Sequence, residues 1–293
     1  MNKMKYFVCI PRGGIADIFN VIGNCLDYCV KYNRILVIYN KGDWIEGDIQ
    51  KYITFTHENI YKGDVTDKIR VLENMSIFPN EIKNIENIKS VYFKNKNNNR
   101  GYHICSDTKD NEFIFGHTDL SKDYEENVVV YLNCYGGVNE NIFNYIKFTN
   151  IVLDVYYKRL LCLKDDYISI HVRNTDAITE NLDEFLNTIN NEIENNDCVF
   201  LASDNKKNID HIRNKYGKKI YTFSNITYNN GGNMHYRYDK KILTNEEVVI
   251  DCLVDLLLLS NGKQLFYSCN CSNYSLVANY LLNHKDVLNK LIK

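Results

Sequence analysis

The second half of the chain alternates short apolar segments with longer segments of helical periodicity, and this alternation limits the folds open to it. The predicted strands are Ile168–Val172, Cys198–Ala202, Lys219–Thr222 and Gln264–Ser268, and the predicted helices are Leu182–Glu194, Lys206–Tyr216, Glu246–Leu259 and a segment from Asn273. Strands that alternate with helices of this length are typical of a doubly wound parallel sheet. We therefore predict an α/β fold for this half.

The first half opens with a strand, a glycine turn, a helix and a second strand. Tyr6–Ile10 is apolar, a helical pattern runs from Ile15 to about Asn33, and Arg34–Tyr39 is apolar again. Such strands are joined by a right-handed parallel crossover. The intervening Gly13-Gly14 turn would let backbone N–H groups approach a ligand at a helix N-terminus. A tight turn without a ligand is the alternative, because the full dinucleotide fingerprint is absent.

The middle of the chain is less regular. Residues from about Lys51 to Asn127 contain two strand-like segments, Val91–Phe93 and Glu112–Phe115, and no motif that we recognise. Val128–Leu132 is a buried strand, and a long helical pattern from about Asn139 to Leu163 is expected to link two halves. We therefore expect two domains, residues 1–150 and 151–293, in a chain of 293 residues.

Composition and charge exclude several classes of protein. The net charge of −2 gives no general affinity for polyanions, so a nucleic-acid partner is not expected. No apolar run approaches the ~20 residues that span a bilayer, and the first residues lead straight into a strand without a signal peptide. The expectation is a soluble, cytoplasmic protein; the sequence does not indicate its oligomeric state.

The cysteines point to free thiols. Five of the ten lie in apolar runs, where a thiol behaves as a small core residue: Cys9, Cys25, Cys29, Cys198 and Cys252. Cys269-Asn270-Cys271 is too closely spaced for a zinc finger, and no second Cys/His pair flanks it. We expect reduced cysteines and no metal site.

The strand at Ile168–Val172 ends in an unusual group of polar residues. His171, Arg173 and Asp176 follow its apolar start within a few residues. Ligands of open α/β sheets bind at the carboxyl ends of strands, and arginine can hold a diphosphate with two parallel hydrogen bonds. This stretch therefore predicts a site for an anionic ligand.

Four motifs in order resemble the fucosyltransferase superfamily. His171-Val172-Arg173-Asn174-Thr175-Asp176 is similar to the His-Val-Arg-Arg-Thr-Asp motif of α1,6-fucosyltransferases and bacterial nodulation fucosyltransferases, and to the related motif of α1,2- and protein O-fucosyltransferases. The later motifs are Val199–Asp204, His235–Tyr238 and Asp251–Ser275. The resemblance implies a GT-B fold, with two Rossmann-like domains facing across a cleft. It further implies an acceptor-side N-terminal domain and a C-terminal domain that binds the nucleotide sugar.

The implied activity is transfer of fucose, with inversion, from GDP-fucose to a glycan or protein hydroxyl. No cofactor is expected, and the chain contains no Asp-x-Asp triplet to clamp a metal. Two departures, Asn174 for the motif's second arginine and Ala177 for a frequent lysine, leave two alternatives. One is a transferase for another nucleotide sugar, and the other is a non-catalytic relative that binds GDP or a glycan.

The resemblance assigns donor-binding roles to particular residues. Arg173 would stabilise the leaving diphosphate; a structural ion pair with Asp176 or Asp204 is the alternative. The motif places an aspartate at Asp255, where it would accept from the N–H groups of guanine, with His171 beside the base. An acidic residue in so apolar a helix is costly unless it is paired, and an aspartate on the helix surface is the alternative. Asp251, one turn earlier, is expected to be exposed.

Two turns complete the predicted donor site. Ser272-Asn273-Tyr274-Ser275 opens the last long helix, where a serine can cap the N-terminus and free N–H groups can bind phosphate. Capping alone is the alternative. The Gly13-Gly14 turn and Trp44 resemble the part of the fucosyltransferases that faces the donor sugar.

The general base is the least determined role. Relatives use a glutamate shortly after the Thr-Asp pair, and Glu180 is the nearest match. Asp176 and Asp183 remain alternatives, and Glu180 could equally be a charge in the first turn of a helix.

Overall fold

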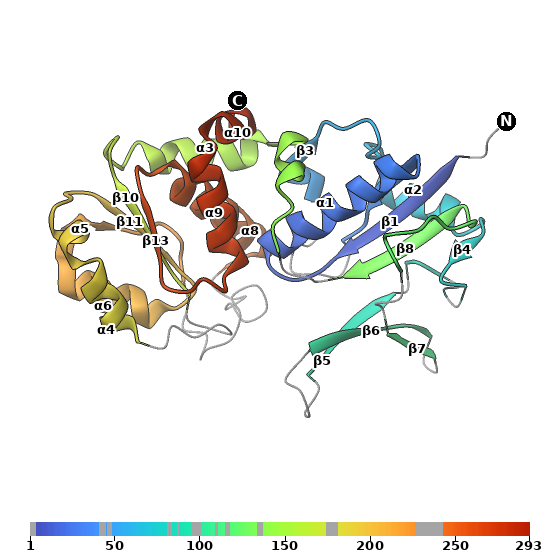
Figure 1. The fold of residues 1–293 in the computed structure, drawn as a ribbon, viewed down its shortest axis with the longest axis horizontal. Coiled ribbons are helices and arrows are strands. Elements are labelled where there is room, and N and C mark those ends of the chain that lie inside the picture. Colours follow the sequence, from blue (N-terminus) through green and yellow to red (C-terminus); the bar gives the residue numbers. More distant parts are fainter. Residues whose placement is uncertain are drawn as a thin grey trace.

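The structure, a computed structural model of the chain, describes most of the sequence. The described residues are 4–40, 45, 49–80, 82, 84–86, 88–94, 101–108, 111–114, 118–133, 137–173, 181–226 and 243–293. Within them, two parallel sheets organise the two halves of the chain (Figure 1).

The first sheet has the strand order β2-β1-β8-β4 and is parallel throughout. Its strands are β1 (Lys5–Pro11), β2 (Arg34–Ile38), β4 (Ile77–Phe78) and β8 (Val128–Asn133). The crossover helix α1 (Ile15–Lys31) joins β1 to β2 and buries one whole side among the core residues. The predicted strand, turn, helix and strand are confirmed.

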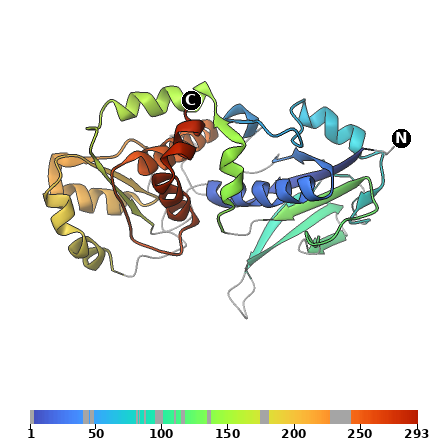
Figure 2. The ribbon, with the colours of Figure 1, turned by 45° about the horizontal axis from the view of Figure 1, so that its top comes forward.

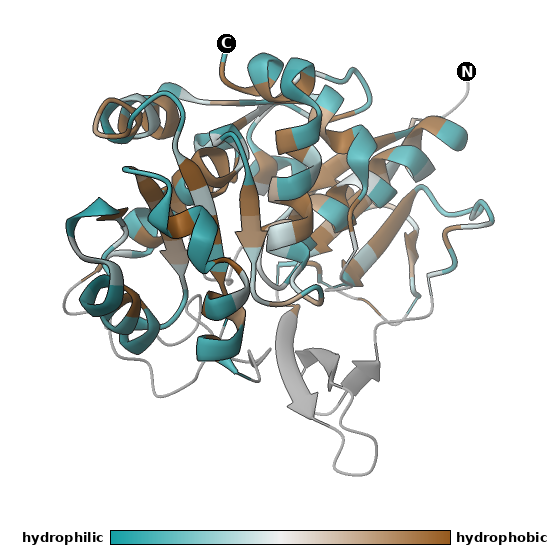
Figure 3. Cartoon of the chain, turned by 60° about the vertical axis from the view of Figure 1, so that its left-hand side comes forward, coloured by the Kyte–Doolittle hydropathy of each residue, from teal (hydrophilic) through white to brown (hydrophobic). Residues whose placement is uncertain are grey.

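The second sheet has the order β12-β11-β10-β13 and is also parallel. Its strands are β10 (Ile168–Val172), β11 (Val199–Ser203), β12 (Ile220–Tyr221) and β13 (Leu265–Tyr267), and its helices are α4 (Leu182–Thr188), α5 (Asn190–Glu194), α6 (Lys206–Tyr216), α8 (Asn245–Asn261) and α9 (Asn273–Asn283). Helices α4, α5 and α6 share a core with one face, whereas α8 and α9 pack on the other. The predicted doubly wound sheet is therefore confirmed, and Figure 3 shows its hydrophobic strands enclosed by helices with hydrophilic outer surfaces.

Smaller elements surround the first sheet. A three-stranded antiparallel sheet of β5 (Lys89–Lys94), β6 (Gly101–Thr108) and β7 (Asn111–Ile114) projects beside it (Figure 1). The other elements are η1 (Ile49–Lys51), β3 (Ile53–Phe55), α2 (Val65–Leu72), η2 (Glu140–Asn144), β9 (Ile146–Phe148), α3 (Asn150–Leu160), η3 (Gly217–Lys219) and α10 (Lys285–Leu291).

The prediction of one helix from Asn139 to Leu163 is wrong. The segment forms the short helix η2, the strand β9 and the helix α3. In β9, Ile146 and Phe148 are buried on either side of exposed Lys147, which is the alternation of a strand, and β9 pairs with β3. Thr149 then adopts an extended backbone and begins α3 as its N-cap. The predicted helix Leu182–Glu194 is likewise two helices, α4 and α5, separated at Ile189.

The two halves share one hydrophobic core. A single cluster of buried side chains includes residues of α1, η2, α3, α8, α9 and α10. The ring centroids of Phe143 and Tyr280 are 5.8 Å apart, and Lys51 Nζ lies 2.6 Å from Glu246 Oε2. Figure 2 shows the C-terminal helices packed against the first half. Among the described helices, none has both the length and the apolar character to cross a bilayer.

The cysteines are only partly as expected. Cys9, Cys25, Cys29 and Cys198 are buried free thiols, and Cys252 is a free thiol at an intermediate position. Cys269 and Cys271, however, form a disulfide. Their Cα atoms are 5.3 Å apart, which is within the ordinary range for a disulfide, so one intervening residue is enough for the pair.

A fully buried arginine ties the base of the first sheet together. The Arg34 side chain donates to Asp123 Oδ1 from Nε at 2.9 Å and from Nη2 at 2.7 Å. It also donates to the backbone oxygens of Tyr6, Tyr124 and Glu126. The guanidinium therefore fixes β1 and β2 against the segment that precedes β8.

We predict that Asp123→Ala lowers the free energy of unfolding by about 3 kcal/mol, because it leaves a buried guanidinium without its carboxylate. The measurement is urea unfolding followed by circular dichroism. The control is Asp67→Ala, which removes an exposed ion pair with Arg70 and should cost less than about 1 kcal/mol. Equal losses in the two variants would contradict the role assigned to Arg34.

Candidate active site

The site is built at the carboxyl end of β10. Ser169 donates to Leu258 O of α8 and His171 bonds to α9, whereas Ile168, Ile170 and Val172 belong to the core on the opposite face. This is the alternation of a strand, and it directs His171 toward α9. Ser268 N donates to His171 O and Arg173 N donates to Ser268 Oγ, both at 3.1 Å, so the end of β10 is joined to the loop after β13.

The Arg173 guanidinium forms an ion pair with Asp204. Nη1 lies 2.9 Å from Oδ2 of Asp204, which follows β11, and the Arg173 side chain is 23% exposed. This is the pairing that the structural alternative predicted. It is compatible with ligand binding, because the N–H donors of a guanidinium point in several directions and can hold a carboxylate and a phosphate together.

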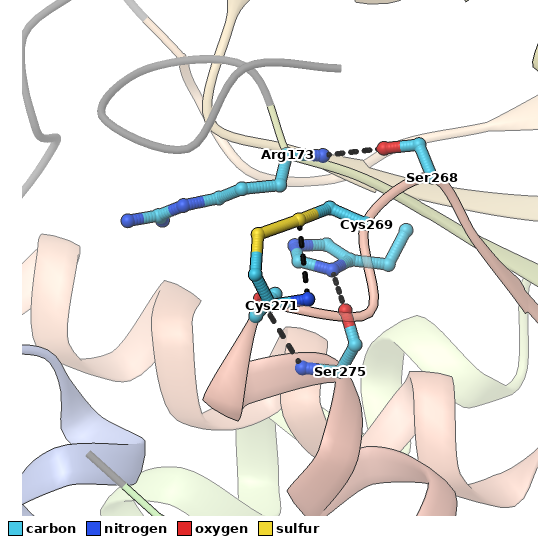
Figure 4. The surroundings of a disulfide bond; sticks show 7 residues. Arg173, Ser268, Cys269, Cys271 and Ser275 are labelled. Atoms are coloured by element: carbon cyan, nitrogen blue, oxygen red, sulfur yellow. Dashed lines mark hydrogen bonds between the residues drawn. A yellow bond between two sulfur atoms is a disulfide. The ribbon is translucent and has the colours of Figure 1, made fainter. Parts of the chain in front are cut away.

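The first turn of α9 adjoins the end of β10. Ser272 is the N-cap, and its side chain accepts from Ser275 N at 3.4 Å, as predicted for a capping serine. The buried Ser275 Oγ lies 2.6 Å from His171 Nδ1 (Figure 4). Burial, assisted by the charge of Arg173, lowers the pKa of His171 to about 3, so the imidazole is neutral at ordinary pH.

The loop between β13 and α9 is closed by the disulfide. Cys269 and Cys271 are bonded, and Cys271 N donates to Cys269 Sγ at 3.2 Å. Figure 4 draws this pair together with Arg173, Ser268 and Ser275. The disulfide therefore constrains the short connection that carries the chain from β13 into the first turn of α9.

Tyr274 and Asn273 extend the site in two directions. Tyr274 O–H donates to Cys252 O of α8 at 2.6 Å, and its ring centroid is 5.1 Å from that of His171. Asn273 Nδ2 donates to Asp17 Oδ1 of α1 at 2.8 Å. The first turn of α9 thus contacts the central helix of its own half and the first helix of the other half.

The Gly13-Gly14 turn lies at that second contact. Gly13 has φ +99°, and a Cβ built there would lie 3.0 Å from Asp17 Oδ2, so glycine is required at this position. Gly14 N donates to Asp17 Oδ2 at 3.2 Å, which caps α1 with a carboxylate. The sequence did not single out Asp17.

Asp255 is buried in the middle of α8, with 7% of its surface exposed. Ser224 Oγ donates to its Oδ2 at 2.6 Å, and Arg159 Nη1 lies 3.6 Å from its Oδ1. Burial raises the pKa of Asp255 to about 7; the Ser224 bond and Arg159 lower it, whereas Asp251 raises it.

The prediction that Asp251 is exposed is wrong. Its side chain is 17% exposed and pairs with Arg159 Nη2, and its Oδ2 accepts from Asn225 N at 3.3 Å. Both aspartates lie on the side of α8 that faces α3, so both need the same cation. Arg159 and Ser224 had no signal in the sequence beyond the need for a partner near the buried carboxylate of Asp255.

Of the three candidates for the general base, only Asp183 lies among the described residues. Asp176 and Glu180 lie outside the described residues, as do Asn174, Ala177, Trp44 and the His235–Tyr238 motif. Asp183 lies in the first turn of α4; its side chain is 66% exposed, and its Oδ1 is 2.8 Å from His211 Nε2. In the described part of the chain, no cluster of three or more His, Cys, Asp or Glu side chains could hold a metal ion.

The fold matches solved fucosyltransferase structures. The fucosyltransferase NodZ from Bradyrhizobium aligns with a TM-score of 0.63 at 15% identity, over 95% of this chain and 92% of that one. NodZ α-1,6-fucosyltransferase soaked with GDP-fucose gives 0.64 at 14% identity, with coverages of 95% and 93%. POFUT1 in complex with GDP-fucose gives 0.54 at 10% identity, with coverages of 96% and 94%.

The sequence itself matches no protein-family model and no curated protein. At such low identities the structural likeness establishes the fold alone. The predicted α/β fold of the GT-B type is confirmed.

We predict that the stability difference between the wild type and Asp255→Asn depends on pH. Asp255 has a pKa of about 7 in the folded protein and about 3.9 when unfolded. Ionisation is therefore penalised only in the folded state, and this contribution to stability is lost as pH rises from about 4 to about 7. Relative to Asp255→Asn, the wild type should lose at most about 4 kcal/mol over that range.

The measurement is urea unfolding of both proteins at a series of pH values. Taking the difference removes the opposite trend of His171, whose low pKa makes the protein more stable as pH rises toward about 6.5. Asp154→Asn, a change at an exposed aspartate of α3, is the control and should leave the difference from wild type constant. A constant difference for Asp255→Asn would refute the burial effect.

Proposed function

We propose that the chain is a fucosyltransferase that moves fucose from GDP-fucose to a hydroxyl group of a glycan or protein, with inversion and without a metal ion. The observation that carries this proposal is the joining of the β10 end to the first turn of α9 through His171 and Ser275, and to the loop that leads into α9 through Arg173 and Ser268. A cation and a helix N-terminus at the carboxyl edge of a parallel sheet suit a diphosphate. The GT-B fold and the sequence motifs agree with this reading.

In this proposal the diphosphate is stabilised by two sources of positive potential. Arg173 donates to the phosphate oxygens while Asp204 orients its guanidinium. The backbone N–H groups of Asn273 and Tyr274 at the start of α9 supply the second source, since the Ser272 side chain caps Ser275 N instead. Charge that develops on the departing GDP is met by these groups, which accounts for leaving-group stabilisation without a metal.

The guanine is recognised by Asp255, with His171 beside it. A neutral imidazole and the adjoining Tyr274 ring offer an uncharged surface for a purine, whereas the Asp255 carboxylate accepts from N–H groups of the base. Residues 151–293 therefore form the donor-binding domain, and residues 1–150 form the acceptor side, where the Gly13-Gly14 turn approaches the sugar.

The acceptor hydroxyl attacks the anomeric carbon of fucose as GDP leaves, and a carboxylate takes its proton. Glu180 is the first choice for this base, with Asp176 next. Asp183 is less suited, because it pairs with His211 of α6 on the outer side of the sheet.

The direct test is turnover. Wild-type protein incubated with GDP-fucose and candidate glycans should release GDP and form a fucosylated product, detected by mass spectrometry, and it should bind GDP more tightly than UDP. Binding of GDP without transfer to any acceptor or to water would support a binding protein instead. Preference for UDP would support a transferase with another donor.

We predict that Arg173→Ala weakens GDP binding by about 10- to 100-fold, because it removes charge-assisted hydrogen bonds to the diphosphate. GMP lacks the terminal phosphate, so its affinity should change much less. Isothermal titration with both nucleotides gives the comparison. Arg213→Ala is the matched control, since this exposed arginine of α6 donates only to Thr222 O among the described contacts. An equal effect on GDP and GMP would contradict the assignment.

A further inference from the structure

Helix α8 carries two aspartates that face the same way in an apolar environment. Asp251 and Asp255 are one helical turn apart, and like charges at this spacing repel. The residues around them, including Leu253, Val254 and Leu256, are fully buried. Two carboxylates remain ionised in such a place only if a cation lies against both.

Arg159 of α3 is that cation. One end of its guanidinium, Nη2, bonds to Asp251 Oδ1, and the other, Nη1, is 3.6 Å from Asp255 Oδ1. Its side chain is 16% exposed. The Phe223 ring lies below it, with 5.8 Å between Cζ and the ring centroid, and Phe223 packs in turn on Phe200 of β11. The guanidinium is therefore held by α3, α8 and the segment after β12.

The segment after β12 also holds the two carboxylates. Ser224 Oγ donates to Asp255 Oδ2, and Asn225 N donates to Asp251 Oδ2. Asp255 Oδ1 and Arg159 Nη1 are both buried, and neither makes a hydrogen bond with the described residues. One acceptor and one donor are thus left next to each other at the edge of the cluster.

We propose that Arg159 is a positioning residue that favours the ionised form of Asp255 and orients it for base recognition, and so sets the preference for guanine. This inference rests on the proposed function, in which Asp255 reads the base. Guanine offers two adjacent N–H donors, which an ionised carboxylate can accept together. Uracil offers one N–H group between two carbonyl oxygens, and a carboxylate repels those oxygens. A protonated Asp255 no longer discriminates between guanine and uracil in this way.

The other described groups around Asp255 cannot replace Arg159. Asp251 opposes ionisation, and Ser224 is neutral. Cys252 of α8 and Tyr274 of α9 also lie close enough to interact with Asp255, but burial raises the pKa of each, so both are neutral. Removing the guanidinium leaves Asp251 facing Asp255 without compensation. Asp255 then takes up a proton at a higher pH than in the wild type.

The test is the pH dependence of GDP and UDP affinity between about pH 5.5 and pH 8.5, measured by isothermal titration on the full chain. In the wild type, GDP affinity should rise with pH as Asp255 ionises. Arg159→Met should move the midpoint of that rise upward by about one pH unit or more, which is about fivefold weaker GDP binding, or a greater loss, at the old midpoint. Its preference for GDP over UDP should shrink at neutral pH and return at the alkaline end.

Three further variants separate positioning from simple structural damage. Arg159→Lys keeps a cation and should restore much of the wild-type midpoint. Asp251→Asn removes the opposing charge and should move the midpoint downward, which also tests the inference if Arg159→Met fails to fold. Lys158→Met replaces the exposed neighbouring cation of α3 and should leave the affinity for GDP and for UDP unchanged at every pH.

The outcomes separate this inference from the proposal beneath it. A midpoint that does not move in Arg159→Met or in Asp251→Asn, or a loss of GDP affinity that is the same at every pH, would overturn the role of Arg159 while leaving GDP recognition intact. Wild-type protein that binds no GDP at all would overturn both.

Discussion

The packing of the second half of the molecule depends on how it accommodates the Asp255 carboxylate inside α8. This helix is apolar on nearly every side, and a carboxylate in its middle would cost several kcal/mol without compensation. The compensation comes from two separate segments, Arg159 of α3 and Ser224 after β12, and Arg159 also pairs with Asp251 one turn earlier in α8. These segments must meet at one point for the helix to be buried at all. The same meeting point fixes where α3 crosses α8 and closes the end of the sheet beside β12.

The candidate site has two ends of opposite charge. Arg173 and the first turn of α9 are positive, and Asp255 of α8 is negative once it ionises. Between them lie the neutral His171 and the Tyr274 ring, which connects the two ends by packing near His171 and bonding to Cys252 O. A nucleoside diphosphate has the complementary arrangement, with an anionic diphosphate at one end and N–H donors on the base at the other.

Local patterns in the sequence predicted the elements, but they could not predict their partners. Strand β10 and helix α6 begin and end where the periodicity places them, because their apolar spacing is unambiguous. The segment from Asn139 to Leu163 was mistaken for one helix, since Ile142, Ile146 and Leu153 also fit a helical spacing, and the pairing of β9 with distant β3 decided the outcome. The contacts of Asp251 with Arg159 and of Asn273 with Asp17 join residues separated by 92 and 256 positions. No local pattern encodes contacts of that kind.

The two helix N-termini that face each other are electrostatically different, although both resemble phosphate sites in the sequence. Helix α1 has Asp17 in its first turn, and that carboxylate already accepts from Gly14 N. Helix α9 has no acidic residue in its first turn, and its cap is a neutral serine. A diphosphate placed between them is repelled by the first and attracted by the second. The hydrogen bond from Asn273 to Asp17 holds these two ends together, so in the proposed function the Gly13-Gly14 turn would face the uncharged sugar and α9 the phosphates.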